Sequence, residues 1–176
     1  MRRTPATLTG LALALLLGAC STPDDSPVPT TAAAPWACPG VPQEGVDLIL
    51  GGAAEDTETR NSWEPGLGHA TFGCLADRGD DARLTVTYGG PGSGPTADSM
   101  KTMRGAVPIT ADATGEGWAD QSDELNVAVW ECGDNVLMVR FEGTVEGRDS
   151  LTDATHLLVS MLPWACDGAE VPGLPG

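Results

Sequence analysis

The sequence predicts a single α+β domain: a mostly antiparallel sheet, two or three helices packed on one face, and two disulfides. Three observations support this fold class. The chain has 176 residues, which suits one domain once its tails are set aside. Short alternating segments and short helical repeats interleave too irregularly for a doubly wound parallel sheet. Four of the five cysteines lie between residues 36 and 168, an even number that fits two disulfides.

The first half of this domain predicts one helix and two strands. Apolar residues recur at helical spacing over 46–50, and Gly51 follows as a helix-ending residue. A strand is expected at 70–76. A second strand is expected at 84–88, because the run Leu-Thr-Val-Thr-Tyr alternates apolar and polar side chains. The Gly-rich run that follows is expected to be a flexible loop, because it lacks the Lys-Ser/Thr ending of a phosphate-binding loop.

A helix and a hairpin are predicted next. The helix spans 96–104, with Thr96 as its N-cap and apolar residues at steps of three and four. The hairpin joins strands at 125–131 and 136–142 through the Gly-Asp-Asn turn at 133–135, residues that tolerate positive φ angles.

The last element is the clearest helix in the sequence. Ser150 and Asp153 resemble a capping box, with Asp in the place of Glu or Gln. An apolar stripe then runs from Leu151 to Leu162, and the helix is expected to end at Pro163.

The amino terminus has the three-part layout of a secretory signal over residues 1–19. Arg2 and Arg3 supply a positive start, an apolar run follows at 8–17, and small residues precede Cys20. The apolar run is too short to span a membrane, which takes roughly 20 apolar residues.

The four residues Leu17-Gly18-Ala19-Cys20 resemble the lipobox of bacterial lipoproteins at every position. The resemblance implies that Cys20 carries a lipid and becomes the new amino terminus after cleavage. It implies attachment to the extracellular face of the cell membrane, with the membrane itself as a partner. Two or more acyl chains anchor a protein stably, because each buried methylene adds about 0.8 kcal/mol.

Residues 20–35 are expected to be the lipidated cysteine and a Pro/Thr/Ala-rich tether. Four prolines interrupt helix and strand, and the segment has no aromatic residue to start a core. Extended as polyproline II, it would reach about 45 Å at about 3.1 Å per residue. The domain would then occupy 36–168, followed by a Pro/Gly-rich tail at 169–176.

The cysteines of an exported domain are expected to pair. Sequence alone permits three pairings of Cys38, Cys74, Cys132 and Cys166. Cys38–Cys74 with Cys132–Cys166 is favoured, because the two closed segments are similar in length and each half of the domain gains a staple. A Cys38–Cys166 pairing stays open, because Trp-Ala-Cys occurs at both positions. No pair has the CxxC spacing of a zinc or redox site.

The formal charge of −16 excludes nucleic acid as a partner, because it has the wrong sign to neutralise phosphates. Removal of Arg2 and Arg3 with the signal would make the rest more acidic still. An acidic body adds no electrostatic adhesion to an anionic membrane, so the lipid would have to hold it.

The order of features along the chain resembles a family of small extracellular domains in actinobacterial lipoproteins, the domain-of-unknown-function family 3558. The features are a Cys, a short helix ending in Gly-Gly, a Trp, a second Cys, an alternating strand, the Gly-Glu-Gly-Trp-Ala run at 115–119, a hairpin and a terminal helix. Cys132 and Cys166 depart from that pattern. The resemblance carries no catalytic residues.

No residue pattern indicates catalysis, a metal or a cofactor. His69 is expected in a turn and His156 on the polar side of the last helix, so neither is expected to ligate a metal. The acidic run at 77–81 lacks the spacing of an EF-hand loop and is expected to be a solvated turn rather than a calcium site. The five tryptophans are expected mainly in the core; Trp63 and Trp118 are the candidates for a ligand groove.

The sequence therefore predicts a non-enzymatic, membrane-anchored binding or interaction domain for an extracytoplasmic protein or small ligand. One alternative is a sensor or accessory subunit of a cell-envelope complex, which an exposed apolar patch would favour. A hydrolase is the other alternative, and it would need a pocket that joins His69 or His156 to carboxylates with shifted pKa values.

Overall fold

The computed structural model describes residues 25–60 and 72–174. Its elements, in chain order, are β1 (Trp36–Cys38), β2 (Val41–Pro42), α1 (Gln43–Leu50), β3 (Asp56–Arg60), β4 (Phe72–Arg78), β5 (Ala82–Gly89), α2 (Ala97–Lys101), β6 (Val107–Ile109), β7 (Glu116–Ser122), β8 (Leu125–Cys132), β9 (Asn135–Glu142) and α3 (Ser150–Ala165).

The core of the fold is a seven-stranded sheet in the order β3-β4-β5-β9-β8-β7-β6. Every neighbouring pair is antiparallel. The strands β1 and β2 form a separate two-stranded sheet beside it. The predicted α+β fold with an antiparallel sheet and two disulfides is confirmed, as is the hairpin formed by β8 and β9.

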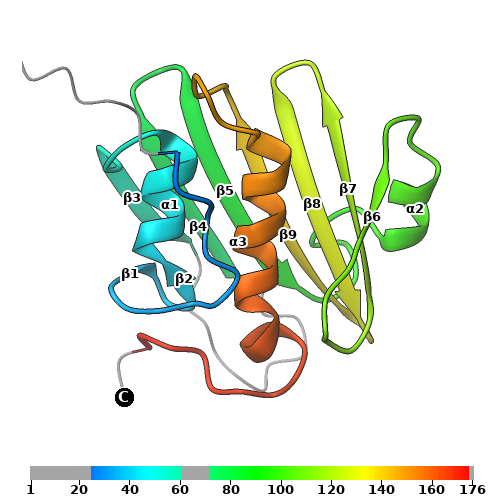
Figure 1. Cartoon of the computed structure of the whole chain (residues 1–176). Helices are drawn as coiled ribbons and strands as arrows, with labels where there is room; N and C mark the ends of the chain where they lie inside the picture. Colours follow the sequence, from blue (N-terminus) through cyan, green and yellow to red (C-terminus); the bar gives the residue numbers. More distant parts are fainter. Residues whose placement is uncertain (1–24, 61–71, 175–176) are drawn as a thin grey trace, which may run out of the picture.

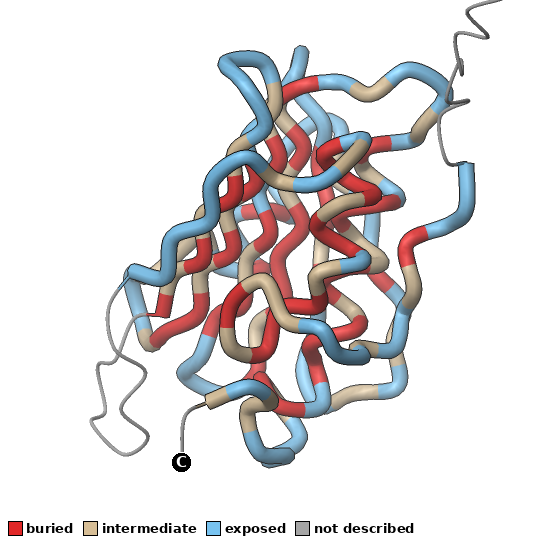
Figure 2. Tube along the Cα trace, turned by 90° about the vertical axis from the view of Figure 1, so that its left-hand side faces the viewer, coloured by how far each residue is buried: buried red, intermediate tan, exposed pale blue. Residues whose placement is uncertain are grey.

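Two helices, α1 and α3, cover one face of the sheet (Figure 1). The core lies between them and that face, and Figure 2 shows the buried residues gathered in this layer. Its largest members include Phe72, Phe141 and Leu137 from the strands and Leu157 and Leu158 from α3. We call this the core face and the opposite side the outer face.

The third helix, α2, packs on the outer face. Its Met100 forms a small buried cluster with Val129 and Val136, whose side chains point away from α3. The predicted cap is confirmed, because Thr96 Oγ1 accepts a hydrogen bond from the Ser99 backbone N–H at 3.2 Å. The helix ends at Lys101 rather than at the predicted residue 104.

The ends of α3 differ from the prediction. The N-cap is Asp149 rather than Ser150, and its carboxylate accepts a hydrogen bond from the Thr152 N–H at 3.0 Å. The helix passes through Pro163 and ends at Ala165. A proline this close to the end removes only one intrahelical donor, so the last turn still forms. That turn buries Trp164 in the core.

The favoured disulfide pairing is confirmed. Cys38 and Cys74 join β1 to β4, and Cys132 joins the end of β8 to Cys166 just after α3. The closed segments have nearly equal separations of 36 and 34 residues. In a chain-entropy model each loop contributes roughly 3–4 kcal/mol to stability.

Residues 25–35, predicted to belong to a free tether, lie against the domain instead; we call this segment the strap. Its Val28 is only 2% exposed and belongs to the main core. The prediction failed because a single apolar residue gives no periodic signal, although it fills a space that Gly45 of α1 leaves beside Leu157 of α3.

Candidate functional site

A wide hollow lies at one end of the outer face, between two hairpin turns. Its volume is about 1100 Å³. The β4–β5 turn stands on one side and the β7–β8 turn on the other, with the end of β9 as the floor between them (Figure 1). We call this hollow the acidic saddle.

Eight of the fourteen residues that line the acidic saddle are carboxylates. They are Glu55, Asp56, Asp77, Asp80, Asp81, Asp123, Glu124 and Glu142. Arg83 is the one cation among the fourteen. Its Nε donates to Asp77 Oδ1 at 2.7 Å, and that hydrogen bond raises the pKa of Arg83 above its usual range. Arg140, one row farther along the sheet, pairs with Glu142 at 3.1 Å. Each of these two cations is paired with one carboxylate, so most of the eight carboxylates are not neutralised and the saddle is strongly negative.

Strand register explains why these carboxylates meet. Arg83 faces Asp77 on one side and Glu142 on the other, and Leu125 is the next partner of Glu142. Residues opposite one another across antiparallel strands share a face, so this row lies together on the outer face. The turns project beyond it. The β7–β8 turn is tight because Asp123 adopts a positive φ of 50°, which Asp tolerates better than most residues.

A second hollow of about 370 Å³ lies between α1, the β9–α3 loop and the strap. Leu48, Val145 and Pro35 give it an apolar part. One wall is Arg148, which forms a bidentate pair with Asp153: Nε to Oδ2 at 2.7 Å and Nη2 to Oδ1 at 2.9 Å. The side chains of this pair are only 4% and 8% exposed, so the pair is a structural clamp at the start of α3.

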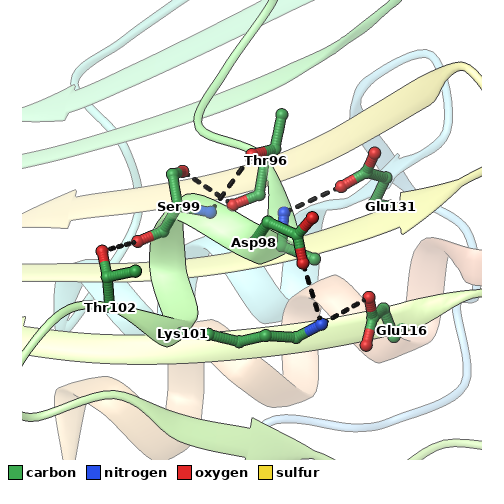
Figure 3. A network of polar contacts seen from close by, with 8 residues as sticks. Thr96, Asp98, Ser99, Lys101, Thr102, Glu116 and Glu131 are labelled. Atoms are coloured by element: carbon green, nitrogen blue, oxygen red, sulfur yellow. Dashed lines mark hydrogen bonds and ion pairs between the residues drawn. The ribbon is translucent and has the colours of Figure 1, made fainter.

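A polar network fixes α2 to the outer face (Figure 3). Lys101, the single lysine of the chain, binds Glu116 at 2.8 Å and Asp98 at 3.1 Å. The hydrogen bonds to these carboxylates, Glu116 foremost, raise the pKa of Lys101. Glu131 accepts from the Ala97 N–H at 2.8 Å. The Lys101 ammonium is paired with two carboxylates and has a raised pKa, so it is a poor nucleophile. The role of the network is to hold α2 in place.

The tryptophans of the described chain mostly serve packing. Trp130 and Trp164 are buried, and their indole N–H groups donate to the carbonyls of Thr114 and Gly40. Trp118, one of the two candidate ligand residues, is half-buried on the outer face, with the Lys101 ammonium 5.9 Å from its ring centre. It lies outside the acidic saddle. Trp63, the other candidate, falls outside the described residues.

The two histidines and Cys20 were the other residues singled out from the sequence. His156 is half-buried rather than fully exposed, and its Nδ1 lies 3.1 Å from the carbonyl oxygen of Val28 in the strap. His69 and Cys20 fall outside the described residues. Within 25–60 and 72–174, no three His, Cys, Asp or Glu side chains form a group that could hold a metal ion.

Comparison of the chain with protein-family models, with curated proteins and with solved structures finds no match in any of the three. The resemblance to family 3558 therefore stays a prediction. Among the helices of the described chain, none combines the length and the apolarity needed to cross a membrane.

Sequence reasoning found only one wall of the acidic saddle, the turn at 77–81. It missed the carboxylates of β3, of the β7–β8 turn and of the end of β9. Each is a pair or single acid at the end of a strand, and such residues are common in solvated turns. The available signal was the recurrence of acidic residues at successive turns. Only the strand order shows that these turns lie together and form one site.

Proposed function

We propose that the protein is a lipid-anchored, non-enzymatic interaction domain of the cell surface that contacts a cationic partner through its acidic saddle. The observation that carries this proposal is the saddle: a hollow of about 1100 Å³ lined by eight carboxylates and one arginine, which is itself paired. Concave surfaces lined by one sign of charge focus the electrostatic field and speed the association of an oppositely charged ligand.

The lipid anchor is supported by the sequence at Leu17–Cys20 and is compatible with the domain. Two disulfides suit an oxidising compartment outside the cytoplasm. The negative charge of the body gives no adhesion to anionic headgroups, so stable attachment needs the acyl chains.

The proposal that the domain has no enzymatic activity is based on the contacts of two side chains, His156 and Lys101. His156 contacts a backbone carbonyl of the strap, and Lys101 is held between two carboxylates. These contacts give both side chains a structural role.

Binding of an oligolysine peptide, followed by calorimetry at low and at physiological salt, tests the saddle. One variant neutralises four saddle acids, and a control variant neutralises four exposed acids elsewhere, so that the net charge changes equally. The saddle set is Asp80→Asn, Asp81→Asn, Asp123→Asn and Glu124→Gln. The control set is Asp112→Asn, Asp134→Asn, Glu146→Gln and Glu170→Gln. We expect the saddle variant to lose several-fold more affinity than the control. Equal losses would show that only net charge matters and would overturn the saddle as the binding surface.

Labelling with an alkyne-bearing palmitate analogue in a bacterium that processes lipoproteins tests the anchor. Cys20→Ala is expected to abolish the label, whereas Ser21→Ala, the neighbouring control, retains it. Detergent phase partitioning gives a second readout, because the labelled protein enters the detergent phase. A label that survives Cys20→Ala would refute the anchor.

A further inference from the structure

The strap fixes the point at which the chain leaves the domain. The Ser26 carbonyl accepts a hydrogen bond from Arg148 Nη1 at 3.0 Å, and the Val28 carbonyl lies 3.1 Å from His156 Nδ1. The Val28 side chain is buried between α1 and α3. One buried apolar side chain and two polar contacts therefore hold the first described residues on the helix layer.

This exit point lies at the same end of the molecule as the acidic saddle. Arg148 belongs to the β9–α3 loop, which also supplies Gly143 and Thr144 to the saddle. In Figure 1 the blue start of the described chain is at the upper end, with the β4–β5 and β7–β8 turns. The β8–β9 turn lies at the opposite end, because β9 runs antiparallel to β5 from that turn toward the saddle.

The chain length between the anchor and the exit is short compared with the domain. From Cys20 to Ser26 the chain spans at most about 22 Å. From the first to the last of its eight residues, β5 alone rises about 24 Å, and the turns add to this length. If the β8–β9 turn faced the bilayer, the exit point would stand farther from the lipid than the chain can reach.

We propose that the strap orients the domain, so that the end bearing the acidic saddle faces the bilayer and the β8–β9 turn points away. This inference rests on the lipidation of Cys20 in the proposed function. It places the carboxylates on the membrane side, where anionic headgroups repel them. The lipid and the strap then hold the domain against that repulsion, and the saddle stays open to a cationic partner at the membrane surface.

Fluorescence quenching on vesicles tests the orientation. A dye is attached through an azide-bearing amino acid at position 80 or at position 134, two exposed turn residues at opposite ends of the sheet. The lipoprotein is reconstituted in phosphatidylcholine–phosphatidylglycerol vesicles that contain a headgroup quencher. We expect several-fold stronger quenching at position 80 than at position 134. Equal quenching, or stronger quenching at 134, would overturn the orientation.

A tether insertion gives the matched control. A Gly/Ser linker of about ten residues between Thr22 and Pro23 more than doubles the reach and is expected to bring the two quenching values together. The same linker added after Gly176 is expected to leave the difference unchanged. If the difference in quenching between positions 80 and 134 persists with the lengthened tether, then the strap and the short chain between Cys20 and Ser26 do not set the orientation.

The chain from Cys20 onward, coupled through that thiol to a maleimide lipid, separates this inference from the anchor. The chemical anchor replaces biological lipidation, so the quenching difference is expected even if the cell does not acylate Cys20. Loss of the difference in this preparation refutes the orientation alone, whereas loss of palmitate labelling in cells refutes the anchor alone.

Discussion

The two faces of the sheet are formed by adjacent residues of the same strands, but one face is a packed core and the other is a charged surface. On the core face, Ala128, Val139 and Val86 lie opposite one another in register and are fully buried beneath the helices. One residue along, the outer face presents Arg140 opposite Thr85, both accessible to solvent. Because side chains alternate along a strand, a one-residue step separates a packed layer from a charged surface. The acidic saddle forms on the outer face because α1 and α3 occupy the other one, and α2 covers only the part of the outer face near β7 and β8.

The difference in burial predicts different costs for two arginine deletions. Arg148→Ala is expected to destabilise the domain by about 3–5 kcal/mol, because it leaves the Asp153 carboxylate buried without its partner. Arg140→Ala on the outer face is expected to cost at most about 1 kcal/mol, because its pair with Glu142 is exposed. Urea unfolding measures both. Similar losses of stability would mean that the two ion pairs are equally buried, which would contradict the difference between the packed layer and the outer face.

A smaller loss of stability is expected from a substitution in the strap, which packs against the helices α1 and α3. Val28→Ala is expected to cost about 2 kcal/mol, because it removes two buried methyl groups and leaves a small cavity against α1 and α3. Val107→Ala is the control on edge strand β6, where the side chain is 48% exposed; its expected change is within about 0.5 kcal/mol. Thermal or urea unfolding compares the two. A negligible cost at Val28 would show that the strap contributes nothing to the core.

One polar residue on the core face predicts a gain in stability. Asn126 is fully buried, and neither atom of its amide has a hydrogen-bond partner. Asn126→Leu keeps the branched shape and is expected to stabilise the domain by about 1 kcal/mol, because an unpaired buried amide is costly. Gln121→Leu, its exposed neighbour across β7, is the control and is expected to change stability little. A loss of stability with Asn126→Leu would show that the amide is paired, for example with a buried water.

The smallest expected effect is a pH dependence at the start of α3. The hydrogen bond from the Thr152 N–H lowers the pKa of Asp149 below its unfolded value of about 3.9. The stabilisation is therefore present above that unfolded pKa and is lost as the pH falls through the folded pKa. Asp149→Asn keeps a capping side chain without the charge, so it is expected to remove this part of the acid sensitivity. Urea unfolding from pH 7 to pH 3 measures the difference; identical slopes for both proteins would contradict the prediction.

Local patterns were sufficient for elements whose periodicity is strong. The alternation in β5, the Gly-Asp-Asn turn of the β8–β9 hairpin and the apolar stripe of α3 each predict the observed element. Strands β3 and β6 were not predicted. Residues 56–60 are polar and wholly exposed, and 107–109 form only three residues with a central proline, so neither carries the alternation of a half-buried strand.

The sequence by itself determined the fold class and the acidic charge of the body, because periodicity and composition are local or additive properties. It favoured the observed disulfide pairing by loop length but left a second pairing open, which the tertiary structure decided. Tertiary structure alone decided that acids from β3, two turns and the end of β9 meet in one hollow. It also decided that Val28 joins the core and that α2 lies on the outer face. These features depend on strand order and on gaps between packed side chains, which arise only when distant segments come together.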